Sequence, residues 1–275
     1  MRTRSAAEDV AYVSVPEGGV AYDVAGEGPL VVLVPGMGDL RATYRFLAPA
    51  LRGAGYRVAS MDLRGHGDSD ATFSTYGDVA TAADVTALIE LLGESAVVVG
   101  NSMAAGSAVL VAAQRPELVS GLVLVGPFVR NPSTSVLQQV LLRMAMAPVW
   151  AGLVWKAYLP KLYAGRRPVD FEDYLKQVID SLGRTGHAKA FSVTTHTTHA
   201  PAEARLKDVS AKSLVIMGEL DPDFGNPRAE ADWIAGILQA EVVLVPEAGH
   251  YPHAQRPDIT TPAVLRFLTL VHPHG

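Results

Sequence analysis

The stretch that decides the fold is residues 96–106, which read Ala-Val-Val-Val-Gly-Asn-Ser-Met-Ala-Ala-Gly. Its first part is a continuous apolar run typical of a buried strand, and its second part is a run of small residues typical of a helix. Ser102 lies where the one gives way to the other. The pattern Gly-x-Ser-x-Gly, with Ala104 as a mild departure, predicts a tight strand-to-helix turn that strains the serine backbone and exposes its hydroxyl. The alternative is an ordinary helix N-cap serine.

Outward from this turn, strand-like and helix-like segments alternate along the chain. This alternation predicts an α/β fold with a doubly wound, mostly parallel sheet of eight strands covered by helices on both faces. The expected strands are residues 11–15, 19–24, 30–34, 56–61, 96–99, 119–125, 213–218 and 241–245. The expected helices are residues 42–54, 78–92, 103–115, 228–238 and 260–270.

The alternation stops after Val125 and resumes only at Ser213. The interval is far longer than one crossover helix needs, which predicts an inserted helical cap. We therefore expect a core domain of residues 1–127 and 207–275, with a cap of residues 128–206.

The first part of this cap is strongly apolar and includes Met144, Trp150 and Trp155. The simpler interpretation is that these side chains pack the cap onto the core. The functional interpretation is that they line an apolar substrate pocket.

Composition excludes several classes of function. The 275 residues carry a net charge of −5 with no dense basic stripe, which argues against a nucleic-acid partner. The absence of cysteine excludes disulfides, thiolate metal sites and a cysteine nucleophile. Residues 1–9 do not resemble a secretory signal, and no apolar run is long enough to span a bilayer, so we expect a cytoplasmic protein without a membrane span. The oligomeric state stays open.

A serine hydroxyl becomes a good nucleophile only when a base accepts its proton and a carboxylate orients that base. Asp221 directly follows one predicted strand and His250 directly follows the next. The chain order Ser102, Asp221, His250 is the order of the α/β-hydrolase arrangement. Asp223 and Glu219 are alternative acids, and His253, which the pattern places at the start of the last helix, is an alternative base.

Acyl transfer also needs hydrogen-bond donors aimed at the oxyanion. We assign one donor to the Met103 backbone N–H at the start of a helix. The second is the Met37 N–H, in the loop that reads Pro-Gly-Met-Gly over residues 35–38. The alternative is that the two glycines only make the turn into the next helix, with Asp39 as its cap.

Two further segments carry a family resemblance. Residues 61–69 read Met-Asp-Leu-Arg-Gly-His-Gly-Asp-Ser, and residues 249–253 read Gly-His-Tyr-Pro-His. With Ser102 and its neighbours, they resemble the α/β-hydrolase superfamily from about Gly19 to Leu270, in its esterase, haloperoxidase-like and enol-lactonase branches. Two residues depart from the family pattern, because Pro35 and Asn101 stand where histidine is usual. The Gly-Asn-Ser-Met turn is similar to that of C–C bond hydrolases acting on ring-cleavage products.

Together these features predict a serine hydrolase, without cofactor or metal, that cleaves an ester or lactone of a small, fairly apolar molecule. Other enzymatic hypotheses are a C–C bond hydrolase, a perhydrolase and an acyltransferase. A hypothesis of a different class is a ligand-binding protein that keeps the hydrolase fold.

Overall fold

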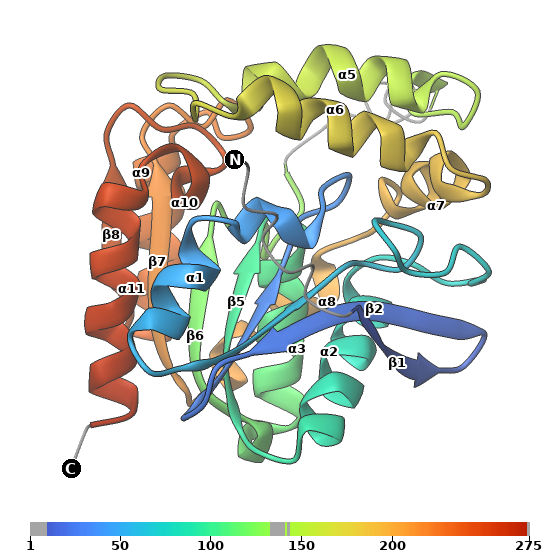
Figure 1. Ribbon diagram of the computed structural model, residues 1–275. Helices are drawn as coiled ribbons and strands as arrows, with labels where there is room; N and C mark the ends of the chain where they lie inside the picture. The colour runs from blue at the N-terminus through green and yellow to red at the C-terminus, as the bar shows by residue number, and fades with distance from the viewer. Residues whose placement is uncertain (1–9, 133–140, 142–143, 274–275) are drawn as a thin grey trace, which may run out of the picture.

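Eight strands form one sheet in the order β1-β2-β4-β3-β5-β6-β7-β8 (Figure 1). This computed structural model describes residues 10–132, 141 and 144–273. The prediction that residues 1–9 are not a secretory signal, and part of the predicted cap, concern residues outside the described part. The strands are β1 (Ala11–Val15), β2 (Gly18–Ala25), β3 (Leu30–Val34), β4 (Arg57–Met61), β5 (Ala96–Asn101), β6 (Val119–Val125), β7 (Lys212–Gly218) and β8 (Glu241–Val245). β2 pairs antiparallel with β1 and β4, and all the other pairings are parallel.

Helices cover both faces of this sheet. Those of the core are α1 (Leu47–Gly53), α2 (Asp78–Leu92), α3 (Met103–Gln114), α9 (Pro227–Leu238), α10 (Pro252–Gln255) and α11 (Pro257–Val271), with short 3₁₀ turns η1 (Arg41–Tyr44), η2 (Pro116–Leu118) and η3 (Leu206–Asp208). The predicted α/β class and eight-stranded sheet are confirmed.

Alternate side chains of the central strands fill two separate cores. In β3, Leu30, Val32 and Val34 pack with α2, α3 and α9 on one face. Val31 and Leu33 point the other way and pack with α1 and α11. All five side chains are fully buried. A strand covered on both faces needs an unbroken apolar sequence, which explains the runs that predicted the sheet.

Two helix predictions differ from the structure. The helix expected over residues 42–54 is divided into η1 and α1. Pro49 has no N–H to continue the hydrogen-bond ladder, so it fits best in the first turn of a helix, where α1 places it. His253 lies in the separate short helix α10 rather than at the start of the last helix, because the chain turns at Arg256 before Pro257 begins α11.

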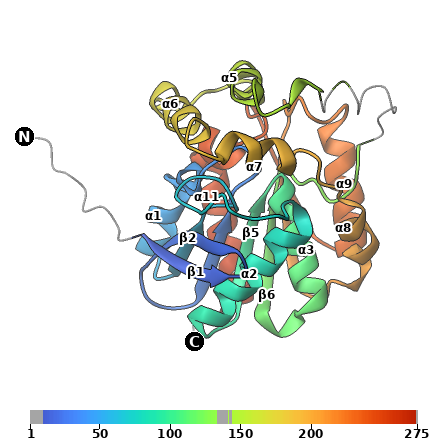
Figure 2. The same cartoon turned by 90° about the vertical axis from the view of Figure 1, so that its right-hand side faces the viewer.

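The described residues between β6 and β7 include the helices α5 (Ala151–Leu162), α6 (Phe171–Leu182), α7 (His187–Thr194) and α8 (Ala200–Arg205). Both views show α5, α6 and α7 above the sheet (Figures 1 and 2). In contrast, Ala202 of α8 and Leu206 pack in the core with α3, although both fall in the range predicted for the cap. The division at residues 128–206 stays a prediction. Among the described residues, no helix has the length and apolarity needed to cross a bilayer.

Candidate active site

Ser102 occupies a strained turn between β5 and α3. Its φ of 57° and ψ of −124° are unusual for a residue with a side chain. The turn is crowded, because a Cβ added at Gly100 would lie 2.4 Å from the carbonyl oxygen of Ala104. The Ser102 N–H donates to the Val125 carbonyl at 2.9 Å. These contacts hold the serine between strand and helix with 7% of its surface exposed.

His250 and Asp221 form a buried pair. His250 follows β8 and Asp221 follows β7, and His250 Nδ1 lies 2.7 Å from Asp221 Oδ2. Burial by itself lowers the pKa of His250. The negative charges of Asp221, Asp223 and Asp39, together with the Asp221 hydrogen bond, outweigh burial and raise this pKa to about 9.

Ser102 and His250 pack on the same short segment at the end of β6. The N–H of Phe128 donates to the Ser102 carbonyl at 3.2 Å, and the Phe128 ring centre lies 5.9 Å from that of His250. A Cβ added at Gly126 would lie 3.2 Å from His250 Nδ1. The residues predicted from three separate strand ends therefore meet at one edge of the sheet.

Asn101 ties the serine turn to the histidine loop. Its side-chain amide donates to the carbonyls of Val125 and His250, at 3.0 and 3.3 Å. The sequence prediction noted Asn101 only as a departure from the family pattern, and the structure gives it this bridging contact.

The loop that follows β3 lies against Ser102. A Cβ added at Gly36 would lie 2.8 Å from Ser102 Cβ, so only glycine fits there. The half-buried Met37 comes next, and no hydrogen bond of the described residues uses its N–H. Met103 is the first residue of α3, where helix geometry leaves the N–H without an intrahelical acceptor. Both N–H groups predicted as oxyanion donors thus belong to segments in contact with Ser102.

His66 fixes the position of this loop and was not singled out from the sequence. Its Nε2 accepts the Gly38 N–H at 3.0 Å, while its Nδ1 lies 2.8 Å from the Arg64 carbonyl. A carbonyl only accepts, so Nδ1 carries the proton. Burial lowers the pKa of His66 to about 4, which keeps the ring neutral and leaves Nε2 free to accept. The Gly-His-Gly of residues 65–67, quoted above for its family resemblance, was the available signal.

Asp223, the alternative acid, lies behind the main pair. Its Oδ2 is 4.0 Å from His250 Nδ1, and its N–H donates to Asp221 Oδ1 at 3.1 Å. Tyr158 of α5 donates its phenol proton to Asp223 Oδ1. Asp221, Asp223 and His250 have ligand atoms close enough to hold a metal ion. However, the 2.7 Å contact between His250 and Asp221 is a hydrogen bond, whose proton occupies the Nδ1 lone pair that a metal would need.

The three predicted cap residues lie in different surroundings. Trp155 is 8% exposed, and its indole N–H donates to the Gly38 carbonyl at 2.8 Å. Met144 and Trp150 are 53% and 46% exposed, and the Trp150 indole donates to the Met144 carbonyl within the cap. Only Trp155 therefore reaches the loop beside Ser102, and a substrate-binding role for the three stays a prediction.

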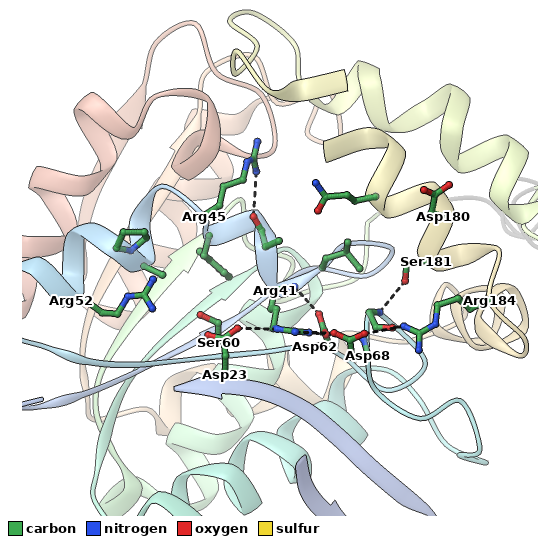
Figure 3. Close-up of a pocket in the computed structure, with 17 residues that line it drawn as sticks. Asp23, Arg41, Arg45, Arg52, Ser60, Asp62, Asp68, Asp180, Ser181 and Arg184 are labelled. Atoms are coloured by element: carbon green, nitrogen blue, oxygen red, sulfur yellow. Dashed lines mark hydrogen bonds and ion pairs between the residues drawn. The ribbon is translucent and has the colours of Figure 1, made fainter. Parts of the chain in front are cut away.

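A cavity of about 1040 Å³ lies between α1 and α6 and is lined by charged side chains together with polar and apolar ones (Figure 3). Arg41 pairs there with the carboxylates of Asp23, Asp62 and Asp68. Ser102, Asp221 and His250 do not line it. Its charged groups distinguish it from the apolar pocket expected for the substrate.

A family model described as "Alpha/beta hydrolase family" matches residues 31–263. The chain belongs to this family and is a hydrolase. Among curated relatives, the 2-hydroxy-6-oxononadienedioate/2-hydroxy-6-oxononatrienedioate hydrolase of Paraburkholderia phymatum is 30% identical over 92% of this chain and 94% of its own length. The 2-(acetamidomethylene)succinate hydrolase of Mesorhizobium japonicum is 26% identical over 88% of this chain and 89% of its own length.

Solved structures share the fold. A bromoperoxidase from Bacillus anthracis superposes with a TM-score of 0.82 at 18% identity, covering 96% of this chain and 100% of its own. A thermophilic esterase from Thermogutta terrifontis has a TM-score of 0.77 at 23% identity, covering 96% of this chain and 98% of its own.

Proposed function

We propose that this hydrolase cleaves a carboxylic ester or lactone of a small, fairly apolar molecule through a serine nucleophile. His250 takes the proton of Ser102, and the serine oxygen attacks the substrate carbonyl. The N–H groups of Met37 and Met103 stabilise the oxyanion. The alcohol leaves with a proton from His250, and a water activated by His250 then hydrolyses the acyl-enzyme. Asp221 orients the imidazole throughout, and no cofactor takes part.

The observation that carries the proposal is the strained Ser102 turn packed on the same segment as a buried His–Asp pair. A serine that only caps a helix needs neither a φ of 57° nor a neighbouring imidazole hydrogen-bonded at 2.7 Å to a carboxylate. A pure binding protein gains nothing from keeping all three groups in this arrangement.

The apolar character of the substrate is supported by the rings around the site. Phe128 packs on His250, and Phe191 lies 5.1 Å from Trp155, ring centre to ring centre, beside Gly38. Such surfaces favour an apolar acyl or alcohol group. The cytoplasmic location and the absence of a nucleic-acid partner stay predictions from sequence.

A second candidate is C–C bond hydrolysis of a vinylogous diketone. The relative from P. phymatum, named 2-hydroxy-6-oxononadienedioate/2-hydroxy-6-oxononatrienedioate hydrolase, favours it, as does the Gly-Asn-Ser-Met turn. Both candidates use the same serine and histidine, so they differ in substrate and not in the groups required.

A fluorophosphonate probe tests the nucleophile. We expect covalent labelling of the wild-type chain and none of Ser102→Ala, with Ser69→Ala as the matched control because Ser69 is a buried serine that accepts from the Ala21 N–H. Folded wild-type protein that resists labelling argues for the binding-protein alternative. Rates on p-nitrophenyl esters and lactones, compared with a vinylogous diketone, separate the two enzymatic candidates.

A further inference from the structure

Helix α5 contacts three of the loops that build the candidate site. Trp155, Tyr158 and Leu162 are spaced by three and then four residues, which places them on the same side of a helix. They reach the loop after β3, the loop after β7 and the loop after β8, respectively. A helix that merely roofs a pocket has no need to bond to each of these loops.

The first contact holds the peptide next to Met37. Trp155 donates to the Gly38 carbonyl, and the Gly38 N–H donates to His66 Nε2, so Gly38 is held from both sides. Its position fixes the adjoining peptide that carries the Met37 N–H. A side chain at Gly38 would collide with Trp155 and Phe191, at 2.6 Å from each ring.

The second contact reaches the acid loop. Tyr158 donates to Asp223, whose N–H in turn donates to Asp221. The phenol therefore compensates part of a negative charge that lies 4.0 Å from His250 Nδ1.

The third contact is made by the backbone at the end of α5. The His250 N–H donates to the Leu162 carbonyl at 2.8 Å. The two segments approach so closely that a Cβ at Gly249 would lie 2.2 Å from that carbonyl oxygen. The position of His250 is thus set by the cap as well as by β8.

We propose that α5 is a positioning helix, with Trp155 holding the oxyanion loop and Tyr158 holding the acid loop in their active geometry. The inference rests on the proposed function, since it assigns these residues to the same reaction. It implies that the enzyme is competent only while α5 is docked on the core.

Trp155→Phe tests the first contact, because it keeps an aromatic ring and removes only the indole N–H and part of the ring area. We expect kcat to fall by about ten- to a hundredfold, because small displacements of catalytic groups have effects of this size, while KM changes little. Trp233→Phe is the matched control, since Trp233 lies on α9 with its ring under Arg130 and has no proposed part in the site, and we expect wild-type kinetics from it. A raised KM with unchanged kcat in Trp155→Phe would make Trp155 a substrate contact and overturn the proposal.

Tyr158→Phe tests the second contact through the pH dependence of kcat/KM. The charged and titratable groups around His250 are Asp221, Asp223, Asp39, the neutral His253 and Tyr251, whose ring centre lies 5.2 Å from that of His250 and whose pKa burial raises. Without the phenol, the Asp223 charge is less compensated and favours protonated His250. The acid limb of the profile should move to higher pH by roughly half a unit.

An Asp223→Asn background supplies the control for Tyr158→Phe. With the carboxylate gone, the tyrosine substitution should leave the limb where Asp223→Asn alone puts it. A limb unmoved by Tyr158→Phe in the wild-type background, or moved equally in both, contradicts the assignment.

A readout that needs no activity separates this inference from the proposed function. In protein labelled with ¹⁵N-methionine, Trp155→Phe should shift the Met37 amide resonance and Trp233→Phe should not. A wild-type chain that fluorophosphonate fails to label defeats the proposed function alone. A Met37 resonance unchanged by Trp155→Phe defeats the positioning role even in an active enzyme.

Discussion

Helices α5 and α6 both lie above the sheet (Figure 1) and each has twelve residues, but they contact the core in different ways. α5 uses uncharged donors and a backbone carbonyl, and its partners are the loops that carry Met37, Asp221 and His250. α6 lies over the charged cavity of Figure 3. Around it, Arg45 pairs with Asp170 and Arg184 pairs with Asp68.

The two kinds of contact differ in how precisely they fix the geometry of the groups that they join. The ion pairs Arg45–Asp170 and Arg184–Asp68, which we call the α6 seam, are partly exposed to solvent. Such pairs are screened by salt and tolerate changes of geometry, so they contribute little to a precise arrangement. Two of the α5 contacts, at the Gly38 and Leu162 carbonyls, are hydrogen bonds between neutral groups, which are directional and costly to leave unmade. We therefore expect the α5 contacts to set the geometry of the site and the ion pairs around α6 to contribute little to it.

The largest effect expected concerns the loop that Tyr158 contacts. Asp221→Asn should lower kcat by about 10⁴-fold, because an amide neither holds the correct tautomer of His250 nor stabilises its protonated form. Asp223→Asn should lower kcat by less than tenfold, since Asp223 lies 4.0 Å from Nδ1 and Asp221 only 2.7 Å. Steady-state kinetics on an ester that the enzyme hydrolyses measure kcat for both variants. The reverse ranking would make Asp223 the acid and Tyr158 its direct partner.

The pH dependence of the wild-type enzyme is the next test. Only neutral His250 accepts the serine proton, so the raised pKa predicts an acid limb of kcat/KM well above 6.5 and toward 9. The same raised pKa stabilises the folded state fully below about pH 6.5, and that contribution is lost as the pH rises through 9. Activity should therefore rise with pH while this part of the free energy of unfolding declines.

A variant at the α5 contact with the acid loop and a variant at the α6 seam should give different results in the same pH experiment. Asp223→Asn removes a negative charge near the imidazolium and should move the limb to lower pH. Arg184→Gln, at the α6 seam, should leave the limb in place. If Arg184→Gln shifts the acid limb, the α6 seam also affects the pKa of His250, and the contrast between the two helices fails.

The sequence predicted those parts of the site that depend on single strand ends. Ser102 is the first residue after β5, and Asp221 and His250 lie in the loops that follow β7 and β8; parallel strands bring such ends to one edge of the sheet. Their local sequence therefore suffices to bring them together. The sheet was predicted for a similar reason, since doubly covered strands need long apolar runs.

The contacts that connect these loops depend on pairs distant in sequence. Tyr158 is one residue among many in the apolar part of the predicted cap, and its partner Asp223 is 65 residues further along the chain. Hydropathy did not separate Trp155 from Trp150, because which face of α5 turns toward the core is decided by tertiary packing. His66 lay in a quoted motif, but nothing local indicates that its ring accepts from Gly38.

A smaller effect is expected beside the α6 seam, where Tyr174 donates to the buried Asp39. Burial raises the pKa of Asp39 to about 6, against hydrogen bonds that include the one from Tyr174. Tyr174→Phe should destabilise the folded state by about 1–3 kcal/mol near pH 8, where the carboxylate is charged and loses a donor. Denaturant unfolding measures this, and kcat should change far less than in Trp155→Phe. In an Asp39→Asn background the cost should shrink, because the buried charge is absent.

The smallest effect belongs to Arg184, which is 49% exposed and faces the 43% exposed Asp68. Arg184→Ala should lower the free energy of unfolding by at most about 1 kcal/mol in dilute buffer. Near 1 M salt the Debye length falls to about 3 Å, so most of the ionic part of that difference should disappear. The kcat deficit of Trp155→Phe should be the same at both salt concentrations, since the lost bond joins neutral groups. A salt-dependent deficit in Trp155→Phe would show that charge at the α6 seam also sets the geometry beside Ser102, and the distinction between the two helices would fail.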